Sequence, residues 1–551
     1  MYKQILLFSI LIQLYVNVLR CNETKIKIND YYINGVTLSD GNIRAYLGIK
    51  YATNSEKENR FMNSQFADVN SDVIGNVRGV PCYLFKRGKI IEYDESSEDC
   101  LNFDIYLPAN KAPNTLLPLM VYYTNKPYDL VFIQNYLSKG MAVAIVHFRE
   151  GVFGYFYTGE DSKPNDYGHS DISLSLQWIH KYKSNFNITG YITLIAEEDS
   201  ASQLSWALER DDVKANMFNK LILLNGNKFS ERSIPSKSAR VYSARLLKQI
   251  DCHIPSYSQA TDCLKTKSIE EIKKALDSME FDEVDGMPFR PFSEVKEKPT
   301  LKKNYVTLLG ISKNIMSEYK SVDEFNEKYT YRDFKIFLHK LINDYENVNA
   351  PLVRRLIMHD YLYTEGNKTD TYNLWQISRR ILFDKVFRSP LKELAYDILL
   401  PNKKNKIWLF EYEVVNAFET CVKSNFPEYL EKFCQRLNEY IIRFVLKGAP
   451  TENSCNPENP TFPMLGSTKR NYFLQLKDDG TVEWDFPFYQ RRVTLWNNLI
   501  PFLNKLELVG KRLPMADIHD DLFHDQQMPN FYEEDDYQKW HNDIIEGHLE
   551  L

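Results

Sequence analysis

The stretch YITLIAEEDSASQLSWAL (Tyr191–Leu208) decides the fold. Its apolar run Ile192–Ile195 predicts a buried strand, and the apolar residues that follow the run are spaced as in a helix: Leu204, Trp206, Leu208. A strand that turns sharply into a helix is where some enzymes hold a nucleophilic serine, in the pattern Gly-x-Ser-x-Gly. Here the turn reads Ala196-Glu197-Glu198-Asp199-Ser200 and contains no glycine.

Short apolar runs alternate with helical patterns through the first half of the chain. The strand-like runs are LPLMVYY (Leu117–Tyr123), MAVAIVHF (Met141–Phe148) and KLILLNG (Lys220–Gly226), and ISLSLQWIHKY (Ile172–Tyr182) has helical spacing. Continuous apolar strands separated by helices are typical of a parallel sheet that is covered on both faces. The sequence therefore predicts an α/β fold, followed by a charged and mostly helical region over residues 231–380.

The composition excludes some functions. The formal net charge of the 551 residues is -6, so the chain lacks the basic character of a nucleic-acid-binding protein. We find no motif for a metal, a nucleotide or another cofactor, and we expect none to be bound.

Both ends of the sequence carry targeting signals. Residues 1–21 combine Lys3 with an apolar run, which predicts a cleaved signal peptide and no transmembrane anchor after cleavage. The acidic residues 506–551 predict a weakly docked tail, and it ends in His548-Leu549-Glu550-Leu551, a variant of the endoplasmic reticulum retention signal. We expect a secretory protein that is either extracellular or retained in that lumen.

Secretory entry favours disulfide pairing of the eight cysteines and glycosylation of the sequons at Asn22, Asn187 and Asn367. The pairs Cys82–Cys100 and Cys252–Cys263 each close a short loop. Cys421, Cys434 and Cys455 form a late cluster in which Cys421–Cys434 is one pairing, and Cys21 leaves with a cleaved signal.

Several blocks give the chain a family resemblance, because they occur in the order found in the cholinesterase and carboxylesterase type B family of α/β-hydrolases. The blocks are EDCLNFDIYLP (Glu98–Pro108), HFREGVFGYF (His147–Phe156), NDYGHSDISLSLQWI (Asn165–Ile179), VDGMPFRP (Val284–Pro291) and LWNNLIPFL (Leu495–Leu503). The resemblance implies one α/β-hydrolase domain over residues 25–505, a large and mostly parallel sheet with helical insertions, and Cys82 as the partner of Cys100. It also implies family-like dimerisation around Gln490–Leu503.

The nucleophile of the family does not carry over. A gapless alignment of strand and helix places Glu198 at the position of the serine, and this is the register we favour. A rival register, shifted by two residues, makes Ser200 the nucleophile, but it needs an insertion in the turn and still lacks the glycines.

The other catalytic positions have also changed. The segment that resembles the family's histidine region is CVKSNFPEY (Cys421–Tyr429), and it places Val422 at the position of the base. The position of the acid falls on Ile315, with Glu318 three residues away. The oxyanion glycines are replaced by Asn125, Lys126 and Pro127, and proline has no N–H group to donate.

We therefore expect a catalytically inactive relative of the neuroligin, neurotactin and glutactin kind, which binds a protein partner or a small hydrophobic ligand. We also expect an ion pair between Glu198 and Lys126 across the former active site. Two alternatives stay open: an active carboxylesterase that uses Ser200 with a base outside the family pattern, and a folding or escort module of the endoplasmic reticulum lumen.

Overall fold

The structure is a computed structural model. It describes residues 23–506, except for gaps at residues 40, 54–58, 87–88, 92, 94–95, 112–114, 160–164, 231–232, 235–237, 255, 282–287, 292–304, 316–324, 343–346, 348, 365–366, 400–404, 424, 453–460, 466–472 and 486–489. The predicted signal peptide and acidic tail, with Cys21, Asn22 and His548–Leu551, lie outside the described residues, as do Cys455 and Glu318.

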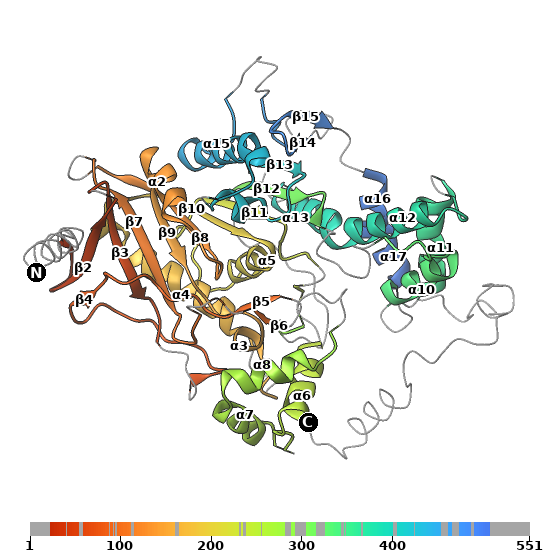
Figure 1. Cartoon of the computed structure of the whole chain (residues 1–551), viewed down its shortest axis with the longest axis horizontal. Helices are drawn as coiled ribbons and strands as arrows, with labels where there is room; N and C mark the ends of the chain where they lie inside the picture. The colour runs from red at the N-terminus through yellow and green to blue at the C-terminus, as the bar shows by residue number, and fades with distance from the viewer. Residues whose placement is uncertain are drawn as a thin grey trace, which may run out of the picture.

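A large mixed sheet runs through the molecule (Figure 1). Its order is β1-β2-β3-β7-β9-β8-β10-β11-β12-β13-β14-β15, and β4 pairs with β2. The strands from β9 to β14 are mutually parallel, and those toward both ends pair antiparallel, apart from β4, which pairs parallel with β2. The bounds are β1 Glu23–Ile28, β2 Tyr31–Leu38, β3 Ile43–Lys50, β4 Val73–Ile74, β7 Asn102–Pro108, β8 Leu117–Tyr123, β9 Ala142–Val146, β10 Ile188–Glu197, β11 Lys220–Leu224, β12 Val306–Ser312, β13 Ile407–Tyr412, β14 Phe473–Leu476 and β15 Val482–Asp485.

Helices cover both faces of this sheet. Alternate side chains of β8 enter separate apolar cores, with Val121 in one and Tyr122 in the other. Helices α4 (Tyr167–Tyr182) and α5 (Glu198–Ala207) complete the first core, whereas α2 (Leu130–Ser138) and α15 (Glu431–Lys447) complete the second. The predicted α/β class is confirmed, with the strand runs read from the sequence forming β8, β9, β10 and β11.

The region over residues 231–380, predicted to be mostly helical, also contains a strand of the central sheet. It holds helices α6 Ser238–Gln249, α7 Tyr257–Thr266, α8 Ile269–Asp277, α10 Tyr331–Leu341, α11 Ala350–Met358 and α12 Thr371–Phe383, but also the central strand β12. Strand β12 pairs with β11 and β13, and its side chains are almost all buried. It was missed because charged segments surround a short apolar run. Helices α13 Ser389–Leu399, α16 Gln490–Thr494 and α17 Ile500–Lys505 lie beside α10 to α12 on one side of the sheet (Figure 1).

Candidate functional site

The turn between β10 and α5 has the geometry of a strained elbow. Glu197 ends the strand, Glu198 begins the helix, and Glu198 has a backbone φ of 57°. A residue other than glycine rarely takes this left-handed conformation. Ser200 lies inside the helix, so Glu198 is the residue presented at the turn.

Close packing against the backbone after β11 holds the elbow in this shape. A Cβ atom added to Gly226, just after β11, would lie 2.0 Å from the carbonyl oxygen of Glu198 and 2.8 Å from Oγ of Ser202. The glycine therefore lets the backbone after β11 approach the turn closely.

An ammonium group bridges carboxylates at the elbow. Nζ of Lys126, which follows β8, lies 2.8 Å from Oε2 of Glu198 and 2.8 Å from Oε2 of Glu419. The side chains of these three residues are mostly buried. Burial alone lowers the pKa of Lys126, but the two carboxylates outweigh this effect and hold that pKa well above its usual value. The predicted pair between Glu198 and Lys126 is confirmed.

The partner Glu419 was not predicted. It lies on the short helix α14 (Ala417–Cys421), where it also accepts a hydrogen bond from Nζ of Lys423 at 3.0 Å. Glu197 ties this helix to the elbow, because its carboxylate accepts the N–H groups of Phe418 at 3.2 Å and Glu419 at 2.9 Å. Burial raises the pKa of Glu197 to about 7. Glu419 lies three residues before Val422, the position assigned to the base, and this proximity was the sequence signal that could have placed Glu419 near the site.

Ser200 has a buried acidic partner. Its Oγ donates a hydrogen bond to Oε1 of Glu150 at 2.8 Å, and Glu150 is only 3% exposed. Burial raises the pKa of Glu150 to about 7. Two buried histidines are engaged elsewhere: Nδ1 of His147 lies 2.6 Å from the carbonyl oxygen of Thr124, and the ring of His169 packs edge-on against Tyr155.

The positions assigned to the base and the acid are apolar core. Val422 is 1% exposed and packs in the core with α15, while Ile315 is 3% exposed and packs in the core with α4 and α5. Neither side chain can accept or orient a proton.

Polar groups of the segment assigned to the oxyanion hole have hydrogen-bond partners. The Asn125 side chain is buried and donates to the carbonyl oxygen of Phe148 at 2.8 Å. The backbone N–H of Lys126 donates to Oγ1 of Thr124 at 3.0 Å, so it is already used. Pro127 is exposed and has no N–H.

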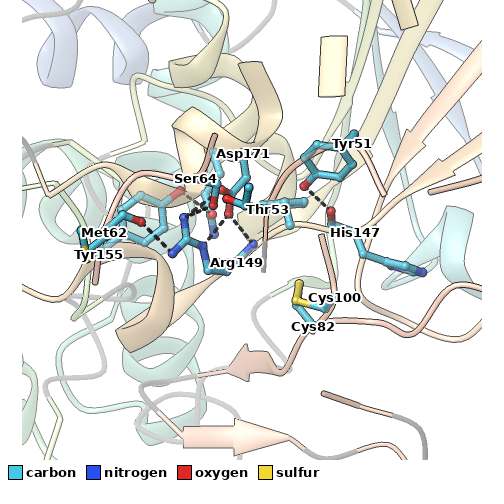
Figure 2. Close-up of polar contacts among 12 residues, drawn as sticks. Tyr51, Thr53, Met62, Ser64, Cys82, Cys100, His147, Arg149, Tyr155 and Asp171 are labelled. Atoms are coloured by element: carbon cyan, nitrogen blue, oxygen red, sulfur yellow. Dashed lines mark hydrogen bonds and ion pairs between the residues drawn. A yellow bond between two sulfur atoms is a disulfide. The ribbon is translucent and has the colours of Figure 1, made fainter. Parts of the chain in front are cut away.

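A buried ion pair fixes the segment that carries Glu150. Nε of Arg149 lies 2.8 Å from Oδ2 of Asp171, and its other nitrogens donate to Met62 and Ser64 (Figure 2). Arg149, Glu150, Phe153 and the Cys82–Cys100 disulfide line a cavity with space for about one water molecule.

Comparison with known proteins agrees with the fold of the chain. The model of the carboxylesterase family matches residues 22–433. The chain belongs to the carboxylesterase family. Its sheet and covering helices are accordingly those of the α/β-hydrolase fold.

Individual carboxylesterases are similar over shorter stretches. Liver carboxylesterase 1F of Rattus norvegicus is 26% identical over 192 residues, which are 34% of this chain and 34% of that protein. Liver carboxylesterase 1 of Mus musculus is 25% identical over 211 residues, 37% of each chain. Liver carboxylesterase of Sus scrofa is 25% identical over 224 residues, 38% of this chain and 39% of that protein. Each match thus spans less than half of the relative.

Other predicted features can be placed in the carboxylesterase fold. Disulfides join Cys82 to Cys100, Cys252 to Cys263 and Cys421 to Cys434. Asn367 is exposed in the loop before α12, whereas Asn187 is half-buried in the turn before β10. Within the described part of the chain, no helix is long and apolar enough to cross a membrane, and no group of acidic, histidine or cysteine side chains is arranged to hold a metal.

Proposed function

We propose that this chain is a non-catalytic member of the carboxylesterase family, which acts by binding a protein partner or a small hydrophobic ligand. The observation that carries the proposal is the ion-paired cluster of Lys126, Glu198 and Glu419 at the elbow. Acyl transfer on this fold needs a nucleophile, a base and free N–H donors at one point. At this point the chain has a neutralised carboxylate and an ammonium group.

Further positions support the same proposal. The backbone φ of Glu198 favours the register in which Glu198 replaces the serine. Val422 and Ile315 supply no base and no acid, and Asn125, Lys126 and Pro127 supply no free pair of donors. Losing one oxyanion donor alone lowers the rate of such enzymes by roughly a hundredfold or more.

The proposed setting is the secretory pathway. The signal peptide at residues 1–21 gives entry, and the ending His548-Leu549-Glu550-Leu551 decides between release and retention in the endoplasmic reticulum. Retention would favour the folding or escort role among the possible binding functions. A homodimer through residues 490–503 also belongs to the proposal, and Leu499 and Phe502 are exposed there.

A second candidate is an esterase that uses Ser200. The hydrogen bond between Ser200 and Glu150 favours it, because a carboxyl group with a pKa of about 7 titrates where a general base works best. Against it, Ser200 is only 8% exposed and lies within α5, away from the elbow position.

The test is hydrolysis of a short-chain aryl ester by the purified protein, run beside labelling with an organophosphate. The variants are Ser200→Ala and, as a matched control on the same helix, Ser202→Ala. We expect no turnover and no adduct in any of the proteins. Turnover that Ser200→Ala abolishes and Ser202→Ala retains would overturn the proposal in favour of the second candidate.

A further inference from the structure

Exposed aromatic rings gather at the start of α12. The ring of Phe325 lies 5.4 Å from that of Tyr372 and 5.4 Å from that of Trp375, between ring centres. Phe325 is 41% exposed and Tyr372 is 54% exposed, while Trp375 lies beneath them at 8%. We call Phe325, Tyr372 and Trp375 the aromatic patch.

The aromatic patch is rigidly built. Nε2 of Gln376 donates to the hydroxyl of Tyr372 at 2.8 Å, and the guanidinium of Arg379 lies 4.7 Å from the centre of the Trp375 ring. The exposed rings of Phe325 and Tyr372 thus form a small apolar surface over Trp375.

A glycosylation sequon lies next to the aromatic patch. Asn367 is exposed, and its Oδ1 accepts hydrogen bonds from the N–H of Thr369 at 3.0 Å and from its Oγ1 at 2.8 Å. The N–H of Asn367 donates to Oδ1 of Asn373, the residue after Tyr372, at 2.8 Å. These bonds fix the sequon against the first turn of α12, which carries the exposed ring of Tyr372.

The other side of this loop is anchored on different aromatic rings. Nζ of Lys368 lies 4.3 Å from the centre of the Tyr363 ring and 5.6 Å from that of Tyr331. The side chain of Lys368, the residue after Asn367, therefore packs on Tyr363 and Tyr331 rather than on the rings of the aromatic patch.

We infer that Asn367 carries an N-linked glycan whose first sugars lie on the rings of Phe325 and Tyr372. An N-acetylglucosamine residue has an apolar face of C–H groups and an acetamide methyl group, and both pack well on an aromatic ring. The sequon supplies this occupant from the chain itself, at a fixed place beside the rings. The inference rests on the secretory entry proposed above and does not depend on whether the elbow is catalytic.

The test is hydroxyl-radical footprinting of the full chain secreted from eukaryotic cells, with each ring read out by mass spectrometry. Three proteins are compared: the wild type, Asn367→Gln, which lacks the sequon, and Thr369→Ser, which keeps it. Tyr429, which is 71% exposed in a different part of the fold, is the reference ring. Enzymatic removal of glycans from the folded wild type repeats the comparison without a substitution.

We expect the oxidation rates of Phe325 and Tyr372 to be lower by about threefold or more in the wild type and in Thr369→Ser than in Asn367→Gln. The rate of Tyr429 should be equal in all three. An unmodified Asn367 in the secreted protein would overturn the inference, and so would a glycan that leaves both ring rates unchanged. An active esterase that shows the protection would overturn the proposed function and leave this inference standing.

Discussion

Nζ of Lys126 lies 2.8 Å from Oε2 of Glu198, the residue that holds the strained turn between β10 and α5. The same ammonium group contacts Glu419, so one cation joins the loop after β8, the elbow and helix α14. Three segments that are far apart in the sequence therefore depend on one positive charge. The elbow is stabilised here by charge pairing.

Replacing Lys126 with methionine should be costly. Glu198 would keep its mostly buried carboxylate without the cation that neutralises it, and Glu419 would lose one of its two lysine partners. Because removal of one partner leaves an uncompensated charge, we expect a loss of about 3 kcal/mol in the free energy of unfolding. Urea unfolding at neutral pH measures it.

The matched control for Lys126→Met is Lys50→Met. Lys50 pairs with Asp99, but its side chain is 53% exposed, so its loss should cost less than about 1 kcal/mol. Adding Glu198→Gln to Lys126→Met should recover part of the stability, because it removes the carboxylate that lost its cation with Lys126. If Lys126→Met and Lys50→Met lose the same free energy of unfolding, Lys126 does not have the stabilising role given to it here.

The fold and the pair between Lys126 and Glu198 were predictable, because strand and helix periodicities and the order of the family motifs can be read directly from the sequence. The contacts of Glu419 and Glu150 were not. Glu419 reaches the site from α14, and Glu150 meets Ser200 only because β9 and β10 lie on either side of β8 in the sheet. Such contacts depend on strand order and side-chain conformation, which no local pattern specifies. Strand β12 was missed for a related reason, since its burial is decided by neighbouring strands.

Glu150 should add to stability as the pH falls from 8 to 5, whereas the buried His147 and His169, whose pKa values burial lowers, should act in the opposite direction. Burial raises the pKa of Glu150 to about 7 in the folded protein, from 4.5 ordinarily. Its contribution to stability is therefore fully present below pH 4.5 and is lost as the pH rises through 7. Glu150→Gln keeps an acceptor for Ser200 and removes the charge, so at pH 8 it should be more stable than the wild type by up to roughly 3 kcal/mol.

Urea unfolding of Glu150→Gln between pH 5 and pH 8 tests this expectation. The variant should still depend on pH, because burial raises the pKa of Glu197 to about 7 and lowers the pKa of His169 to about 3. The control is Glu428→Gln at an exposed position, which should follow the wild type throughout. If the urea unfolding curves of Glu150→Gln and the wild type coincide at pH 8, the ionised Glu150 carboxylate does not destabilise the folded protein, and the expectation is wrong.

Gly226→Ala should displace the elbow, because the new methyl group would collide with its backbone. The added Cβ would lie 2.0 Å from the carbonyl oxygen of Glu198, which belongs to the backbone and can only give way if the turn moves. We expect a loss of about 2–3 kcal/mol in the free energy of unfolding. Gly75→Ala is the control, because its nearest neighbour would lie 3.3 Å away, and it should cost less than about 1 kcal/mol. If Gly226→Ala and Gly75→Ala lose the same free energy of unfolding, the elbow is not tightly packed against Gly226.

The turn before β10 offers a test of backbone conformation alone. Asn187 has a φ of 56°, its N–H donates to the carbonyl oxygen of Ser184, and its own carbonyl oxygen accepts the N–H of Leu117. Asn187→Ala should lower the free energy of unfolding by about 1 kcal/mol, because alanine tolerates the left-handed region poorly. Asn187→Gly should leave it nearly unchanged, since glycine adopts this conformation readily. Protein from bacterial cells, which attach no glycan, isolates the backbone effect in urea unfolding. If the glycine variant loses as much as the alanine variant, the asparagine side chain rather than the left-handed turn determines stability at this position.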